Sequence, residues 1–193
     1  VRNCDMKQKE YSRKEFVKGM AIAAAGFMIV PRHVLGGKGF LAPSDKITVG
    51  IVGAGGKGRE NAAELLKLKD VQITAIADPA SYWDLKDFYY KSKAGREPVK
   101  EMIEGHYKLI NSNYRISEYI DFREMLERES SLDAILCSTP DNTHAYVSIK
   151  ALRAGKHVYC EKPLTHNIWE ARKVREIARE SGLATQMGNV LHS

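Results

Sequence analysis

Short apolar runs and amphipathic segments alternate along most of this sequence. The runs at 46–52 (KITVGIV) and 71–77 (VQITAIA) are rich in β-branched residues, as is typical of strands buried on both faces of a sheet. Between them, apolar residues at 62, 63, 65, 66 and 68 predict an amphipathic helix over 61–68. A strand, a helix and a second strand in succession predict a βαβ unit with parallel strands.

The same alternation continues in the second half of the chain. A short strand is predicted at 114–116, and further strands and helices are predicted in turn at 122–129 (helix), 132–138 (strand), 145–154 (helix), 157–160 (strand), 168–180 (helix) and 183–187 (strand). Gly155 and Gly182 each stop the helix before them. The predicted fold class is therefore α/β, with a doubly wound parallel sheet. In such sheets ligands bind beyond the carboxyl ends of the strands.

The turn after the first predicted strand reads Gly53-Ala54-Gly55-Gly56-Lys57-Gly58. A G-x-G-x-x-G motif placed between a strand and a helix is the fingerprint of a dinucleotide-binding Rossmann fold. Gly53 allows the tight turn, Gly55 lets the backbone approach a pyrophosphate, and Gly58 allows close packing of helix on strand. Together with Gly56 they predict a phosphate site at a helix N-terminus, where free N–H groups and a positive dipole attract anions.

An acid stands at the end of the second predicted strand. Asp78 follows Gly58 by twenty residues. A carboxylate there accepts both hydroxyl hydrogens of a ribose and repels a 2′-phosphate. The predicted cofactor is therefore NAD, with NADP the less favoured alternative.

Residues 79–113 interrupt the alternation, and we interpret them as an insertion with one or two helices over the cofactor or at an oligomer contact. Its aromatic side chains are interpreted as a local core in preference to a ligand cage. They are Tyr82, Trp83, Phe88, Tyr89 and Tyr90.

The net charge of +6 first suggests a nucleic-acid partner, but its distribution argues against one. Residues 1–46 carry nine Lys/Arg against four Asp/Glu, whereas residues 47–193 carry 21 against 20. A phosphate-binding stripe is therefore not expected on the folded domain. The sequence does not have metal-ligand spacing among its three cysteines and six histidines. No metal site is predicted, and Cys137 and Cys160 are interpreted as small buried hydrophobes.

The N-terminal segment is interpreted as a targeting signal. Ser12-Arg13-Lys14-Glu15-Phe16-Val17-Lys18 precedes a 12-residue apolar run, which is shorter than the roughly 20 residues that span a bilayer. The pattern resembles a twin-arginine signal in which a lysine replaces the second arginine, so residues 1–30 predict export to a bacterial periplasm and no stable membrane span. An ordinary amphipathic helix is the alternative. Residues 31–45 are interpreted as a linker or arm, and 46–193 as the folded domain.

Two loops are expected at the ligand-binding edge of the sheet. Thr139-Pro140-Asp141-Asn142-Thr143-His144 follows one strand, and Glu161-Lys162-Pro163 follows the next. Lysine is suited to proton transfer because burial and nearby positive charge lower the pKa of an amine.

With these loops, the glycine turn resembles the Gfo/Idh/MocA oxidoreductase family over about residues 46–193. The resemblance implies a Rossmann domain, and the second α/β domain of the family is not expected within this sequence. It implies that Lys162 orients the substrate and shares in proton transfer, that Glu161 contacts the nicotinamide-side ribose or carboxamide, and that a cis peptide precedes Pro163. Four further residues are implied to line the nicotinamide half of the site: Thr139, Pro140, Asn142 and His144. Asn189 matches the family near the chain end, where G-N-V-L-H-S stands for a usual G-N-Q-x-H-S.

The leading hypothesis is an NAD-dependent oxidoreductase acting on a sugar, a cyclitol or a derivative, and the family implies a homo-oligomer. An NAD-using glycoside hydrolase with a redox-neutral cycle is the first alternative. A non-catalytic cofactor-binding protein is the second.

Overall fold

The computed structural model describes residues 45–189. The predicted leader (1–30) and the predicted linker (31–45, apart from Asp45) lie outside this range, as do residues 190–193. Within it, no helix is both long and apolar enough to cross a bilayer.

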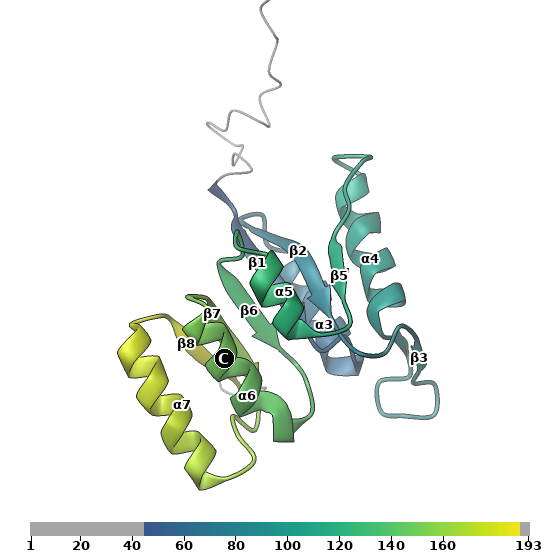
Figure 1. Cartoon of the computed structure of the whole chain (residues 1–193). Helices are drawn as coiled ribbons and strands as arrows, with labels where there is room; N and C mark the ends of the chain where they lie inside the picture. The colour runs from purple at the N-terminus through teal and green to yellow at the C-terminus, as the bar shows by residue number, and fades with distance from the viewer. Residues whose placement is uncertain (1–44, 190–193) are drawn as a thin grey trace, which may run out of the picture. The chain divides into compact units, whose positions relative to one another are not determined.

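A six-stranded parallel sheet forms the centre of the fold (Figure 1), in the order β5-β2-β1-β6-β7-β8. The strands are β1 (Ile47–Val52), β2 (Val71–Ala77), β5 (Ser117–Tyr119), β6 (Ala134–Cys137), β7 (His157–Glu161) and β8 (Thr185–Gly188). The chain moves outward from β1 in one direction and then returns to build the other half from β6. This arrangement confirms the predicted doubly wound Rossmann sheet.

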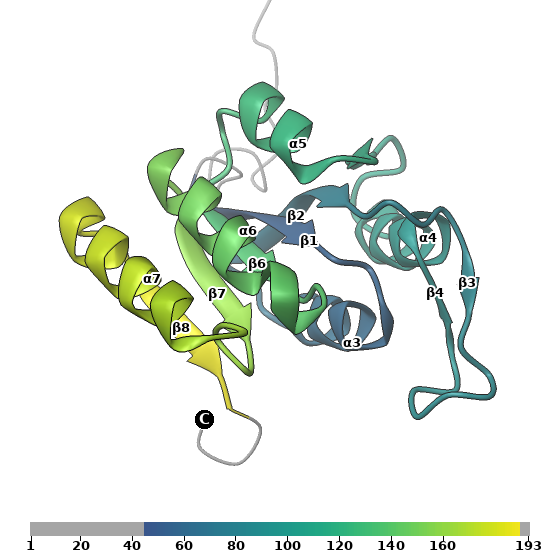
Figure 2. The same cartoon turned by 60° about the horizontal axis from the view of Figure 1, so that its bottom comes forward.

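Helices cover both faces of the sheet (Figures 1 and 2). One face carries α3 (Gly56–Leu65) and α4 (Arg96–Lys108), and the other carries α5 (Phe122–Arg128), α6 (Asp141–Arg153) and α7 (Ile168–Ser181). Two apolar cores result. Ile51 and Ile73 pack with Val99 under α3 and α4, whereas Cys137 and Val158 pack with Val147 under the other helices.

The start of α3 differs from the prediction. The helix begins at Gly56, inside the glycine motif, and ends at Leu65. The predicted range of 61–68 followed apolar residues only, and the first turn has none because it consists of glycines and polar residues. The correction matters for the site, since the helix N-terminus lies directly in the motif.

The prediction of a strand at 114–116 is wrong, because the strand begins three residues later, at Ser117. Ser117 and Tyr119 pair with Ala75 and Ala77 of β2. The backbone N–H of Ile116 is bound instead by the carboxylate of Glu104, at 3.2 Å, so it is not available for a ladder bond.

The insertion contains one helix, α4, and a hairpin of two short strands, β3 (Trp83–Asp84) and β4 (Lys93–Ala94). The interpretation of its aromatic residues as a local core is wrong for most of them. Tyr82, Trp83, Phe88 and Tyr89 are 48%, 50%, 56% and 89% exposed. The buried apolar side chains of the hairpin are Leu85 and Ala94, which the aromatic pattern did not indicate.

Candidate active site

The glycine turn connects β1 to α3 with two very close backbone contacts. Gly53 has a φ of +93°, and a Cβ there would lie 2.7 Å from the carbonyl carbon of Ser138. A Cβ on Gly58 would lie 1.9 Å from the carbonyl oxygen of Gly53. Neither position tolerates a side chain, because backbone atoms occupy the space.

The neighbouring glycines face different surroundings. Among the residues that the structure describes, a Cβ on Gly55 would meet no heavy atom within 4 Å, whereas a Cβ on Gly56 would lie 2.1 Å from Cδ2 of Tyr90. Gly55 is the N-cap of α3, and the first turn carries no acid. The first N–H groups of a helix lack partners within the helix, so this helix start suits an anion.

Asp78 fastens the glycine turn to the end of β2. One carboxylate oxygen accepts the N–H of Ala54 at 2.6 Å, and the other accepts the N–H of Ala80 at 2.8 Å. Each oxygen keeps a second lone pair for a ribose hydroxyl. Next to it, Arg96 donates through one nitrogen to the carbonyl oxygens of Asp78 and Pro79.

Glu161 and Lys162 stand at the carboxyl end of β7, as predicted. The Glu161 carboxylate is 5% exposed and accepts a hydrogen bond of 2.8 Å from Nδ2 of Asn61, which also donates to Oγ of Ser138 at 3.0 Å. Asn61 thus ties α3 to the ends of β6 and β7. The side chain of Lys162 is exposed, and the predicted cis peptide before Pro163 is confirmed.

His144 joins the two loops at this edge. Its ring is 2% exposed, with Nδ1 2.6 Å from the carbonyl oxygen of Pro163 and Nε2 2.7 Å from that of Thr139. Both ring nitrogens thus face backbone carbonyl oxygens, so the side chain holds the loops together. His144 also lines the cavity that contains Lys162.

A cavity of about 590 Å³ lies between these loops, the first turn of α3 and the hairpin. Four of the predicted site residues line it: Thr139, His144, Glu161 and Lys162. Six lining residues were missed by the sequence reasoning: Lys57, Glu60, Tyr89, Tyr90, Ser138 and Asp141. The place of Lys57 and Glu60 inside and just after the glycine motif was the signal available for those two.

Other predicted residues lie around the cavity without lining it. Asn142 and Pro140 are exposed at the start of α6, and Asn189 follows the end of β8. The glycines and Asp78 do not line this cavity and lie instead at the turn after β1 and at the end of β2. The predicted residues therefore divide into a phosphate and ribose half and a half that holds Lys162.

Cys137 and Cys160 face each other on β6 and β7, at 0% and 1% exposure, as expected for buried hydrophobes. The interaction with the Cys160 thiol lowers the pKa of Cys137, and the same interaction raises the pKa of Cys160. With His144 they place three potential metal-ligand atoms within 4.8 Å of one another. Because both ring nitrogens already face carbonyl oxygens, this geometry favours packing over ligation.

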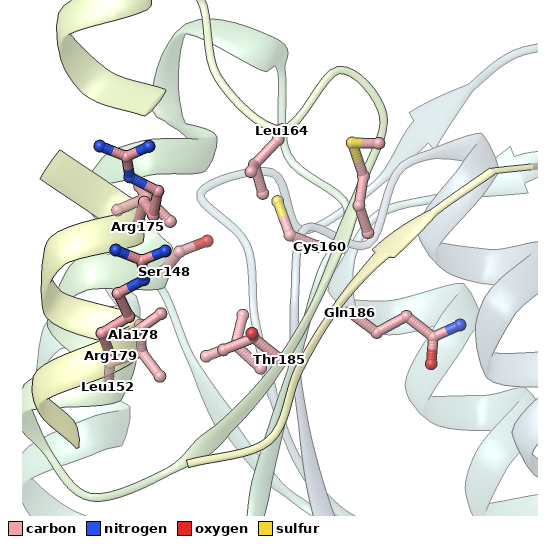
Figure 3. A pocket seen from close by; sticks show the side chains of 12 residues that line it. Ser148, Leu152, Cys160, Leu164, Arg175, Ala178, Arg179, Thr185 and Gln186 are labelled. Carbon is pink, nitrogen blue, oxygen red and sulfur yellow. The ribbon is translucent and has the colours of Figure 1, made fainter. Parts of the chain in front are cut away.

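A second cavity, of about 370 Å³, lies under α7 against β7 and β8 (Figure 3). Figure 3 shows Arg175 and Arg179 on the helix side and Gln186 pointing away beyond β8. The lining is mostly apolar, and the buried hydroxyl of Ser148 has no hydrogen-bond partner among the residues that the structure describes. This cavity lies against a face of the sheet, so it is not the ligand-binding edge.

Comparisons with known proteins agree with the interpretation of this site as a dinucleotide-binding site. Residues 47–189 match the Gfo/Idh/MocA family model, described as an oxidoreductase family with an NAD-binding Rossmann fold. Inositol 2-dehydrogenase from Rubrobacter xylanophilus is 29% identical over 140 residues, covering 72% of this chain and 33% of that protein. A glycosyl hydrolase family 109 protein from Shewanella sp. is 23% identical over 184 residues, covering 88% and 37%.

A solved structure shows the same fold. Scyllo-inositol dehydrogenase from Lactobacillus casei, with bound NAD(H) and scyllo-inositol, matches with a TM-score of 0.56 at 22% identity, over 74% of this chain and 36% of that one. The chain spans about a third of the length of the curated relatives it matches.

Proposed function

This chain belongs to the Gfo/Idh/MocA oxidoreductase family and contains its NAD-binding Rossmann domain, and on this premise we propose that the protein transfers hydride between NAD and a sugar, a cyclitol or a derivative. The inositol dehydrogenase and the other relatives named above support this substrate class. The observation that carries the proposal is the position of Glu161 and Lys162, which line one cavity with the first turn of the phosphate-binding helix.

The groove fits the cofactor. The space in front of Gly55 is open, and the first turn of α3 offers free N–H groups to a diphosphate. Asp78 is placed to accept ribose hydroxyls, which favours NAD over NADP. When bound, NAD accepts hydride from a substrate C–H bond.

Lys162 takes the proton in this proposal. As the hydride leaves the carbon, the hydroxyl on that carbon becomes a carbonyl, and the side-chain nitrogen of Lys162 accepts the hydroxyl proton. Glu161, held by Asn61, positions the end of β7 from which Lys162 extends. In the reverse direction the ammonium returns the proton to the carbonyl oxygen.

The test is a substrate screen on the full-length gene product. The protein is mixed with NAD and a panel of cyclitols, aldoses and sugar derivatives, and NADH formation is followed. Turnover that depends on NAD and on one member of the panel supports the proposal. A protein that binds NAD but reduces none of it with any member counts against the oxidoreductase function.

A redox-neutral glycoside hydrolase is the second candidate. It is favoured by the glycosyl hydrolase family 109 relative, whose match covers 88% of this chain against 72% for the inositol dehydrogenase. In such a cycle a hydride removed from the substrate is returned after elimination of the leaving group. Release of the leaving group from aryl-glycosides with no added electron acceptor, and without net NADH, would select this candidate over the first.

A further inference from the structure

The hairpin of the insertion is built directly onto the glycine turn. The N–H of Gly95, just after β4, donates to the carbonyl oxygen of Ala54 at 2.8 Å. Within the hairpin, the N–H of Leu85 donates to the carbonyl oxygen of Ser92 at 2.8 Å, and the Leu85 side chain is 5% exposed. The base of the hairpin is therefore fixed to the phosphate-binding motif by a backbone hydrogen bond, and the hairpin itself has a buried side chain.

The hairpin returns Tyr90 onto the first turn of α3. A Cβ at position 56 would lie 2.1 Å from Cδ2 and 2.2 Å from Cγ of this ring, whereas a Cβ at position 55 would meet nothing within 4 Å. The missing side chain of Gly56 is thus replaced by an aromatic ring from a distant segment. Gly55 thus leaves space open beside the helix N-terminus, and Gly56 makes room for the ring of Tyr90.

Tyr90 is also part of the cavity that contains Lys162. Its ring packs edge-on against Tyr89, with centroids 5.3 Å apart, and both rings line the cavity. Burial, followed by the nearby carboxylate of Glu60, raises the pKa of the Tyr90 hydroxyl, so the hydroxyl keeps its proton. A protonated phenol at this position is a hydrogen-bond donor for phosphate or ribose oxygens.

We propose that Tyr90 is a cofactor-positioning residue whose ring covers the diphosphate and the nicotinamide-side ribose of a dinucleotide bound at the first turn of α3. The inference rests on the proposed function, because it assumes that the dinucleotide binds this groove. Loss of the contacts between this ring and the bound cofactor is expected mainly in the dissociation rate, where most mutational changes in affinity fall.

The test measures NADH binding to the 193-residue chain by fluorescence, with stopped-flow displacement for the dissociation rate. Tyr90→Ala should raise the dissociation rate and the Kd about tenfold, which is the size expected for loss of an aromatic contact and its hydroxyl. The dissociation rate and Kd of Tyr90→Phe should lie between those of Tyr90→Ala and wild type, because this variant keeps the ring. Phe88→Ala, an exposed aromatic of the same hairpin outside the cavity, should stay within about twofold of wild type.

A double-mutant cycle separates an effect that acts through the Tyr90 ring from a general effect on the fold. Gly56→Ala should displace the ring and raise the dissociation rate, yet in the Tyr90→Ala background it should add less than about twofold. Fully multiplicative effects, or a Tyr90→Ala variant that binds NADH like Phe88→Ala, would overturn the inference and leave the proposed function standing. Should Tyr90→Ala not fold, the single variants Tyr90→Phe and Gly56→Ala decide, and dissociation rates within about twofold of wild type in both would overturn the inference. Absence of NADH binding by the wild-type chain would overturn both proposals.

Discussion

Gly58 lies so close to Gly53 that a Cβ on the former would be 1.9 Å from the carbonyl oxygen of the latter. This contact joins the first turn of α3 to the first residue of the motif and sets how tightly α3 packs on β1. Because the opposing atom belongs to the backbone, it cannot rotate away as a side chain can.

Gly58→Ala should therefore destabilise the fold by about 2 to 3 kcal/mol, the cost of overpacking a rigid contact. Gly55→Ala should cost less than about 1 kcal/mol, since its Cβ enters open space at an N-cap. It should nevertheless abolish measurable NADH binding by filling the path of the diphosphate. Urea unfolding and NADH titration check the pair, and equal stability losses in the two variants would contradict the assignment of roles.

Asp78→Ala tests cofactor preference. The variant should bind NAD about tenfold to a hundredfold more weakly, since charged hydrogen bonds to the ribose are lost. It also frees the N–H groups of Ala54 and Ala80, and that loosening weakens NAD and NADP alike. The informative quantity is the ratio of the two affinities, measured by competition against NADH. A ratio unchanged from wild type would remove Asp78 from the ribose site.

Asn61 is expected to support the buried carboxylate of Glu161. Asn61→Ala removes the 2.8 Å bond to that carboxylate and should destabilise the chain by about 1 to 3 kcal/mol, the cost of leaving a buried polar group short of a partner. The exposed Asn113→Ala is the control and should change stability by less than about 0.5 kcal/mol. Similar urea midpoints for the two variants would show that the bond does not position β7.

Glu104 should make stability depend on acid pH. Its buried carboxylate accepts from Lys108 at 2.8 Å and from the N–H of Ile116 at 3.2 Å, and these bonds hold its pKa below the ordinary 4.5 despite burial. A lowered pKa in the folded state adds stability above pH 4.5 that is lost as pH falls through the folded value.

Glu104→Gln should therefore cost about 1 to 2 kcal/mol at neutral pH, and this difference from wild type should shrink as the pH falls below the ordinary pKa. Unfolding free energies of both proteins across this range provide the measurement, with exposed Glu127→Gln as the control. A difference that is constant with pH would mean that the ionised form is not favoured in the folded state.

The sequence was sufficient for the parts of the fold that repeat a local pattern. Buried strands such as 71–77 are apolar on both faces, and the glycine motif can be recognised from the spacing of its glycines. The insertion was not predictable because its contacts are long-range. The ring of Tyr90 packs on Gly56, which is far from it in the sequence. Nothing in the pattern of aromatic residues distinguishes a ring that packs on the site from one in a local core.

The hydrogen bonds of His144 were likewise not predictable. The family resemblance implied that this residue lines the site, and only the fold shows that Pro163 and Thr139 each direct a carbonyl oxygen at its ring. By contrast, Glu161 and Lys162 were placed correctly because the end of a strand in a parallel sheet fixes the edge at which they lie.

The most direct measurement for the central claim is the turnover of Lys162→Met in the full-length gene product, taken together with its NADH affinity. Lys57→Met, which removes the other lysine of the same cavity, is the matched control for loss of positive charge. We expect Lys162→Met to keep NADH affinity within a few-fold while turnover falls by about two to four orders of magnitude, the loss typical of a positioned acid–base group. Lys57→Met should lose far less turnover. Turnover of Lys162→Met close to wild type, or equal losses in both variants, would contradict a role for Lys162 in proton transfer.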